Sequence, residues 1–258
     1  PRCHVTKSLT MIDAPIRLAI SVGCPSGIGP EVTVKALAAL PDGVVCTLFG
    51  DAGALHDAGF RREAHPGVTL HPASELLAHE RRPGEASRAG GRASLAAIDA
   101  AVDAVLAGEA DAIVTAPVSK KAITDAGFAF LGHTEHLAAR AGVRRVVMLF
   151  AGPHLRASLV TTHHSLADVP ARISREAVEE TVLRTAEAMR DDFSIARPRV
   201  AVSGLNPHAG EGGLLGREEL DVIAPAIASA RAQLDGVDVT GPVPAEAVFR
   251  HARDGRYD

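Results

Sequence analysis

Two apolar runs in the sequence lead into a histidine, a side chain that binds divalent metals. LRASLVTT (155–162) is followed by His163 and His164, and PRVAVSGL (198–205) is followed by His208 within a glycine-rich loop. Adjacent residues of an extended chain point to opposite sides, so at most one of His163 and His164 is expected to face a given site. We predict that His163 and His208 converge as imidazole ligands. The alternative is two unrelated loop histidines, because two ligands rarely suffice for a metal.

Glu246 follows the turn in VTGPVPAEAVF (239–249), at the start of a predicted helix. Its carboxylate can act as a general acid or base, or it can support a metal ligand from behind. A negative charge at this position can also simply stabilise the helix N-terminus. The residues alone leave these interpretations open.

His133 and Thr134 stand ahead of a predicted helix in LGHTEHLAARAG (131–142). Exposed helix N–H groups, an imidazole and a hydroxyl together can bind an anion or a substrate. His136 lies further along and is interpreted as a surface or packing histidine. Lys120, which follows an apolar strand, can hold a phosphate or carboxylate as a point charge. An ordinary helix start with solvated lysines is the alternative for that segment.

The elements that must position these residues alternate between short apolar strands and amphipathic helices. We predict strands at 16–22, 44–50, 68–70, 111–117, 146–150, 155–162 and 198–205, and helices at 30–40, 51–59, 87–108, 118–126, 134–141, 173–190 and 217–233. The strand pair 146–150 and 155–162 can form a hairpin. The alternation predicts an α/β fold with a largely parallel sheet, in which ligands gather at the carboxyl ends of the strands.

The composition excludes several classes of protein. A hydrophobic fraction of 47% and a charged fraction of 22% in 258 residues are typical of a globular chain. The net charge of −4 is too small to indicate a nucleic-acid or membrane partner. Cys3, Cys24 and Cys46 form no metal-type pair and no disulfide framework, which favours the cytoplasm. Residues 1–14 are interpreted as an N-terminal extension and 15–258 as the α/β region.

Taken in order, these segments resemble the 4-hydroxythreonine-4-phosphate dehydrogenase (PdxA) family of vitamin B6 biosynthesis. LNPHAGEGG is the most specific match, GHTEHLA, TTHHSLADVP and GPVPAEAVF follow, and CPSGIGPEV is looser. The resemblance covers nearly the whole chain. It implies an isocitrate/isopropylmalate-dehydrogenase-like α/β fold with mostly parallel sheets, flanking helices and two subdomains. It also implies a cytoplasmic homodimer whose active site lies at the subunit interface.

The resemblance implies oxidation of the C3 hydroxyl of 4-phosphooxy-L-threonine by NAD or NADP, with decarboxylation to 3-amino-2-oxopropyl phosphate. By the same resemblance His133 and Thr134 bind this phosphorylated substrate. His163 and His208 match two of the family's three ligands to a divalent metal (Zn, Mg or Co), and Glu246 is the expected catalytic carboxylate. No cofactor-binding residue is assigned. Sister activities on 4-phospho-threonate, 4-phospho-erythronate or a dihydrodiol are the alternative.

The sequence departs from the family pattern at several positions. Cys24 stands where an acidic residue is usual, Ser119 where Asn is common, and Glu246 where Asp is common. In the family, the sequence after a segment like RYD continues into a strand and a motif that supplies the third metal histidine. A lysine and an arginine for the substrate phosphate and much of the NAD pocket lie further on. We therefore expect that the family's C-terminal segment is absent, and a catalytically inert fragment is a further alternative.

Overall fold

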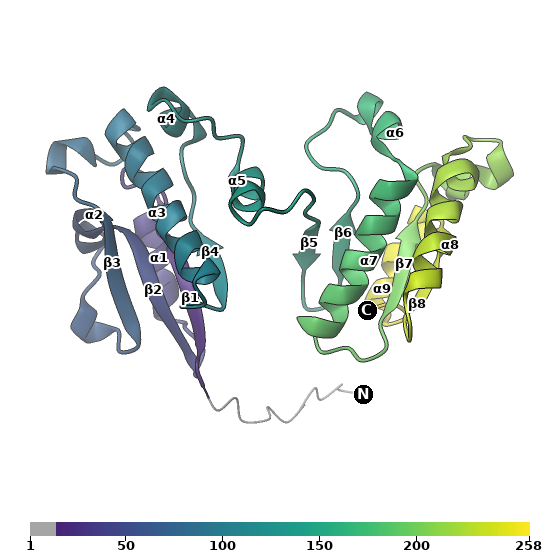
Figure 1. Cartoon of the computed structure of the whole chain (residues 1–258), viewed down its shortest axis with the longest axis horizontal. Coiled ribbons are helices and arrows are strands. Elements are labelled where there is room, and N and C mark those ends of the chain that lie inside the picture. Colours follow the sequence, from purple (N-terminus) through teal and green to yellow (C-terminus); the bar gives the residue numbers. More distant parts are fainter. Residues whose placement is uncertain (1–13) are drawn as a thin grey trace. The chain divides into compact units, whose positions relative to one another are not determined.

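The computed structural model describes residues 14–258, so the predicted N-terminal extension lies, apart from Ala14, outside the described residues. The chain divides into two compact units, one ending at Arg144 and the other running from Arg145 to Asp258 (Figure 1). None of the helices within residues 14–258 combines the length and the hydropathy that crossing a membrane requires.

The first unit is built on a four-stranded parallel sheet in the order β3-β2-β1-β4. Its strands are β1 (Ile16–Ser21), β2 (Val44–Asp51), β3 (Val68–Ser74) and β4 (Ala112–Thr115). Its helices are α1 (Gly29–Leu37), α2 (Ala52–Asp57), α3 (Arg88–Leu106), α4 (Lys120–Asp125) and α5 (His133–Arg140), with 3-10 turns at Arg62–Ala64 and Ala78–Glu80. The alanine-rich α3 buries Ala97, Ile98 and Ala101 completely, which lets it pack closely against the sheet.

The second unit combines an antiparallel hairpin with a parallel strand pair. The hairpin is β5 (Met148–Ala151) and β6 (Arg156–Leu159), and the pair is β7 (Arg199–Ser203) and β8 (Asp238–Val243). Its helices are α6 (Val169–Arg172), α7 (Arg175–Asp191), α8 (Ala224–Gln233) and α9 (Ala245–Arg253), with shorter helical turns at Leu166–Asp168, Pro207–Gly213 and Glu219–Ile223. Val178, Val182, Ile227 and Val239 form a core between α7, α8 and β8.

The predicted α/β fold with parallel sheets is confirmed, and so are the two subdomains and the hairpin. Strand β8 is a correction, because its Gly241-Pro242 pair predicts a turn. The proline is tolerated because the β7–β8 register shifts beside it, and at such an irregularity no ladder donor is needed. A second correction concerns β6, which ends at Leu159 and does not run on to His163.

Candidate functional site

The loop after β7 has an unusual backbone. His208, Ala209 and Glu211 have φ values of 54°, 54° and 45°, in the left-handed region that non-glycine residues rarely adopt. His163 has a φ of 58° and is, with Ser194, the remaining non-glycine residue of this kind in residues 14–258. Such strain persists only where the surroundings impose it, and it concentrates at functional sites. Both predicted metal ligands thus lie on strained backbone.

Glu219 is the residue that holds the His208 loop in place. It is 2% exposed, and its Oε1 accepts hydrogen bonds from the backbone N–H groups of Leu205 (2.8 Å) and Asn206 (2.6 Å). Its Oε2 accepts from the Asn206 side chain at 3.0 Å. Burial by itself raises the pKa of Glu219, but the hydrogen bonds from Asn206 and the backbone outweigh it and lower that pKa. The buried carboxylate is therefore charged and satisfied.

Sequence reasoning missed Glu219, although a signal was present. In the predicted helix 217–233, Glu219 stands four residues before Ile223 and eight before Ile227, on the stripe that faces the core. A carboxylate on an apolar stripe needs a polar partner, because burying it alone is costly. The backbone of the preceding loop is that partner.

His208 and Glu246 form a hydrogen-bonded pair. The Nδ1 of His208 lies 2.6 Å from Oε1 of Glu246, which is in the first turn of α9, and the side chains are 65% and 53% exposed. A hydrogen bond from its own backbone amide and one from His208 lower the pKa of Glu246. An ionised carboxylate only accepts, so Nδ1 carries a proton, and in the neutral form of the ring Nε2 then holds the free lone pair. This is the arrangement that presents a histidine to a metal.

His163 and His164 lie exposed in the loop after β6, in the same unit as His208. Among residues 14–258, no three His, Cys, Asp or Glu side chains come close enough together to hold a metal ion. The chemistry of His208, with an oriented ring and a free Nε2, fits a divalent cation. That His163 joins it as a second ligand stays a prediction.

His133 and Thr134 belong to the first unit, where α5 begins at His133 with Gly132 as its N-cap. The helix thus starts one residue earlier than predicted, and Thr134 is an exposed residue of its first turn. The Nε2 of His133 is buried without a hydrogen-bond partner, and its ring packs nearly perpendicular to that of Phe130, with the ring centroids 5.7 Å apart. Lys120 approaches the same loop and donates to the Leu131 carbonyl at 2.6 Å.

Burial lowers the pKa of His133, and the nearby charges of Lys120 and His136 lower it further. His133 is therefore a neutral imidazole whose Nε2 is free to pair with a ligand. His136 has a different role: its Nε2 lies 2.7 Å from Oδ1 of Asp99 on α3, and Arg140 binds the same carboxylate. This agrees with its interpretation as a packing histidine.

Replacing Lys120 with Met is expected to raise the pKa of His133 toward its ordinary value of 6.5, because one of the charges that oppose protonation is removed. In the unsubstituted chain the pKa of His133 is lower in the folded than in the unfolded state, so the unfolded state binds more protons. The stability of the first unit therefore increases with pH in this range and falls as the pH drops below 6.5. An NMR titration of the imidazole measures the shift. Lys121→Met is the control, since Lys121 pairs with Asp125, and an equal response to both changes would contradict the prediction.

Two departures from the family pattern have structural roles here. Cys24 is 5% exposed, and its backbone N–H donates to the Pro117 carbonyl at 3.0 Å, which ties the loop after β1 to the loop after β4. Gly23, at a φ of 76°, allows this approach, because a Cβ there would lie 2.3 Å from the same carbonyl oxygen. Ser119 caps α4 by accepting from the Ala122 N–H at 3.2 Å. These contacts within the chain account for the positions of Cys24 and Ser119 without any contact to a ligand.

Comparisons with known proteins agree with this description. The sequence model of the family described as "Pyridoxal phosphate biosynthetic protein PdxA" matches residues 49–258. A 4-hydroxythreonine-4-phosphate dehydrogenase from Burkholderia vietnamiensis is 46% identical over 93% of this chain and 76% of its own.

Two solved structures are also similar. A 4-hydroxythreonine-4-phosphate dehydrogenase from Klebsiella pneumoniae superposes with a TM-score of 0.80 at 33% identity, over 95% of this chain and 78% of its own. A terephthalate 1,2-cis-dihydrodiol dehydrogenase from Burkholderia xenovorans has a TM-score of 0.66 at 32% identity, over 93% of this chain and 77% of its own.

Proposed function

The chain belongs to the PdxA family of pyridoxal phosphate biosynthetic proteins, and on that premise we propose how its residues carry out the family's reaction. The activity is that of a 4-hydroxythreonine-4-phosphate dehydrogenase, an NAD(P)-dependent oxidoreductase of pyridoxal phosphate biosynthesis. The identity of 46% over 93% of the chain is the observation that carries this conclusion. The substrate would be 4-phosphooxy-L-threonine: bound NAD(P) would accept the C3 hydride, the C3 hydroxyl would release its proton, and the resulting β-keto acid would lose its carboxylate as carbon dioxide.

His208 and Glu246 are the residues whose geometry fits this chemistry most closely. Glu246 accepts a hydrogen bond from Nδ1 of His208 and fixes the ring, which leaves Nε2 of the neutral imidazole available to a metal. We assign His208 as a ligand to a divalent metal and His163 as a second one. When bound, the metal would supply the positive charge that lowers the pKa of the substrate hydroxyl, and NAD(P) would accept the hydride. Glu246 is thus a positioning residue that acts through His208, rather than the catalytic acid or base.

His133 and Thr134 supply a second set of substrate contacts in this proposal. The neutral imidazole of His133 offers an unpartnered nitrogen, and Thr134 offers an exposed hydroxyl in the first turn of α5. The helix N-terminus favours a negative group beside them. Together they are suited to hold the phosphorylated end of a small anionic substrate.

The test is a direct assay that follows NAD(P)H formation from 4-phosphooxy-L-threonine in the presence of added Zn²⁺, Mg²⁺ or Co²⁺. We expect turnover that depends on the metal, with a kcat/KM at least about 100-fold above that for unphosphorylated 4-hydroxy-L-threonine, because a site built for a charged group discriminates against its absence. 4-Phospho-threonate serves as the comparison that lacks the amino group. Absence of turnover by the 258-residue chain would contradict the proposal for this polypeptide and favour the inert-fragment alternative.

A dihydrodiol dehydrogenase activity is the second candidate, because a structure of that activity shares the fold at 32% identity. The two reactions are separated by the phosphate. Oxidation of a cis-dihydrodiol at a rate equal to or above that of the phosphorylated substrate would favour the second candidate. We further propose that the chain acts in the cytoplasm as a homodimer with an interfacial active site, and analytical ultracentrifugation measures the oligomeric state.

A further inference from the structure

Helix α5, which carries His133 and Thr134, has few apolar contacts that could fix its position. None of its eight residues is buried, and Leu137, its single large apolar residue, is half-buried against the apolar cluster around Ile98 of α3. Its N-cap is Gly132, which has no side chain to cap the helix. A helix of this length is marginal on its own, so its position depends on contacts with its neighbours.

A carboxylate of α3 provides such a contact. Oδ1 of Asp99 lies 2.7 Å from Nε2 of His136 and accepts a hydrogen bond from Nη1 of Arg140 at 2.6 Å. Nη2 of Arg140 donates to Asp103, which lies one turn further along α3. The spacing is four residues on each helix, so one turn of α5 pairs with one turn of α3.

Helix α3 is a rigid base for these hydrogen bonds. It is 19 residues long and buries Ala97, Ile98 and Ala101 completely. The side chain of Asp99 is 33% exposed, whereas that of Asp103 is 63% exposed. Hydrogen bonds to Asp99 are better shielded from water, and we expect them to contribute more than the one to Asp103.

The residues that bind Asp99 lie on the same side of α5 as His133. His133, His136 and Arg140 are three and four residues apart, which places them along one face of the helix. The rings of His133 and His136 both pack on buried Phe130, with centroids 5.7 and 5.6 Å from the centroid of its ring. A movement of α5 that displaces His136 therefore also displaces His133.

The loop before α5 has a polar contact of its own. Nζ of Lys120 donates to the Leu131 carbonyl at 2.6 Å, two residues before His133. His133 thus lies between two polar contacts, one on each side of it along the chain. Because hydrogen bonds are directional and apolar contacts are not, these contacts fix the position of the helix more narrowly than apolar packing would.

We propose that Asp99 is a positioning residue for substrate binding. Its carboxylate fixes α5 on α3 through His136 and Arg140. The first turn of α5 carries His133 and Thr134, and a displacement of about 1 Å at such contacts is costly. The proposal rests on the proposed function, in which these two residues contact the phosphorylated substrate.

The test measures the dissociation constant of 4-phosphooxy-L-threonine, with added Mg²⁺, by NMR titration of the His133 imidazole and the Thr134 amide. We expect Asp99→Ala to raise this constant by at least about tenfold, because α5 loses both hydrogen bonds to the carboxylate. Asp99→Asn keeps an oxygen acceptor at the same position and should stay within about threefold of the unsubstituted chain. Where turnover is measured, Asp99→Ala should raise KM with little change in kcat, because it weakens binding alone.

Asp103→Ala is the matched control, since it also removes one carboxylate from α3 but breaks only the more exposed bond to Arg140. We expect it to change the dissociation constant by less than about threefold. Binding by Asp99→Ala that is as tight as in the unsubstituted chain would overturn the proposal. Binding by Asp99→Asn that is as weak as in Asp99→Ala would also overturn it, since charge rather than position would then decide the affinity.

Hydrogen exchange without substrate separates this proposal from the proposed function. The amide of His136, which donates to the Gly132 carbonyl at 3.1 Å, should exchange at least about tenfold faster in Asp99→Ala, while the amide of Ile98 in α3 is unchanged. Equal exchange at His136 in the two proteins would overturn the proposal, whether or not substrate binds. Faster exchange in Asp99→Ala, with no substrate binding by the unsubstituted chain, would support the fixing of α5 by Asp99 and contradict the proposed function.

Discussion

Glu219→Ala is expected to lower the free energy of unfolding of the second unit by about 3 kcal/mol, because it leaves two partly buried N–H donors of the His208 loop without their buried acceptor. Those donors are the backbone amides of Leu205 and Asn206, at 2.8 and 2.6 Å from Oε1. The Asn206 side chain keeps a second acceptor, Oε2 of Glu218 at 2.8 Å. Urea unfolding with hydrogen exchange resolved by unit measures the change, since two units need not unfold together.

Glu218→Ala is the matched control for this prediction. Glu218 is the neighbouring carboxylate and accepts from the same Asn206 side chain, but it accepts no backbone amide of the loop. We expect it to cost less than about 1 kcal/mol, the value of a single partly exposed hydrogen bond. Equal effects of the two substitutions would refute the view that Glu219 organises the loop.

The Glu219 effect has a defined pH dependence. The folded pKa of Glu219 is lower than its ordinary value of 4.5, so its contribution is fully present above pH 4.5 and is lost as the pH falls through the folded value. The difference between the wild-type chain and Glu219→Ala should therefore shrink under acidic conditions. A difference that grows with acidity would contradict this prediction, because it would mean that the folded pKa of Glu219 lies above 4.5.

His208→Ala is expected to remove bound divalent metal and to lower kcat/KM by at least about 100-fold, because losing a ligand costs more than losing the carboxylate behind it. Metal content after dialysis, measured by mass spectrometry, gives a readout that does not require turnover. His163→Ala is expected to have the same direction of effect. Retention of metal by both variants at the level of the unsubstituted chain would show that the ligand assignment is wrong.

Two controls sharpen the His208 experiment. His164→Ala changes the exposed neighbour of His163 and should leave metal content unchanged. Glu246→Gln keeps an oxygen acceptor for the Nδ1 proton of His208 but removes the charge, and should weaken metal affinity by about 10- to 100-fold. If Glu246 only stabilised the N-terminus of α9, Glu246→Gln would change stability and leave metal affinity unchanged.

The order of elements and the positions of the candidate residues were accessible from the sequence. Apolar runs and amphipathic patterns depend on local periodicity, so they predict β1, β2, α3 and α7 with small errors at the ends. Residues that follow predicted strands, such as His163 and His208, are conspicuous because polar side chains replace apolar ones there. The Gly241-Pro242 pair misled the prediction, because a dipeptide typical of turns here lies within β8, at a shift in register with β7.

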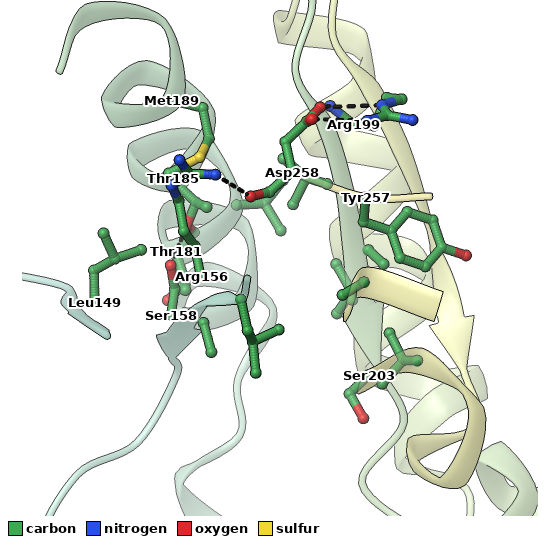
Figure 2. A pocket seen from close by; sticks show the side chains of 18 of the residues that line it. Leu149, Arg156, Ser158, Thr181, Thr185, Met189, Arg199, Ser203, Tyr257 and Asp258 are labelled. Carbon is green, nitrogen blue, oxygen red and sulfur yellow. Dashed lines mark hydrogen bonds and ion pairs between the residues drawn. The ribbon is translucent and has the colours of Figure 1, made fainter. Parts of the chain in front are cut away.

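Residue type and order along the chain were enough to identify the family, the α/β fold and the candidate histidines. The folded structure was needed to see what holds those residues in place. It showed that Glu219, 11 residues beyond His208, binds the start of the loop, and that Glu246, 38 residues beyond it, orients the imidazole. It also showed that Asp258 accepts hydrogen bonds from the backbone and side chain of Arg199 in the second unit (Figure 2), as Asp111 does from Arg17 in the first. Such contacts join residues that are distant in the sequence, and local hydrophobic periodicity does not encode them.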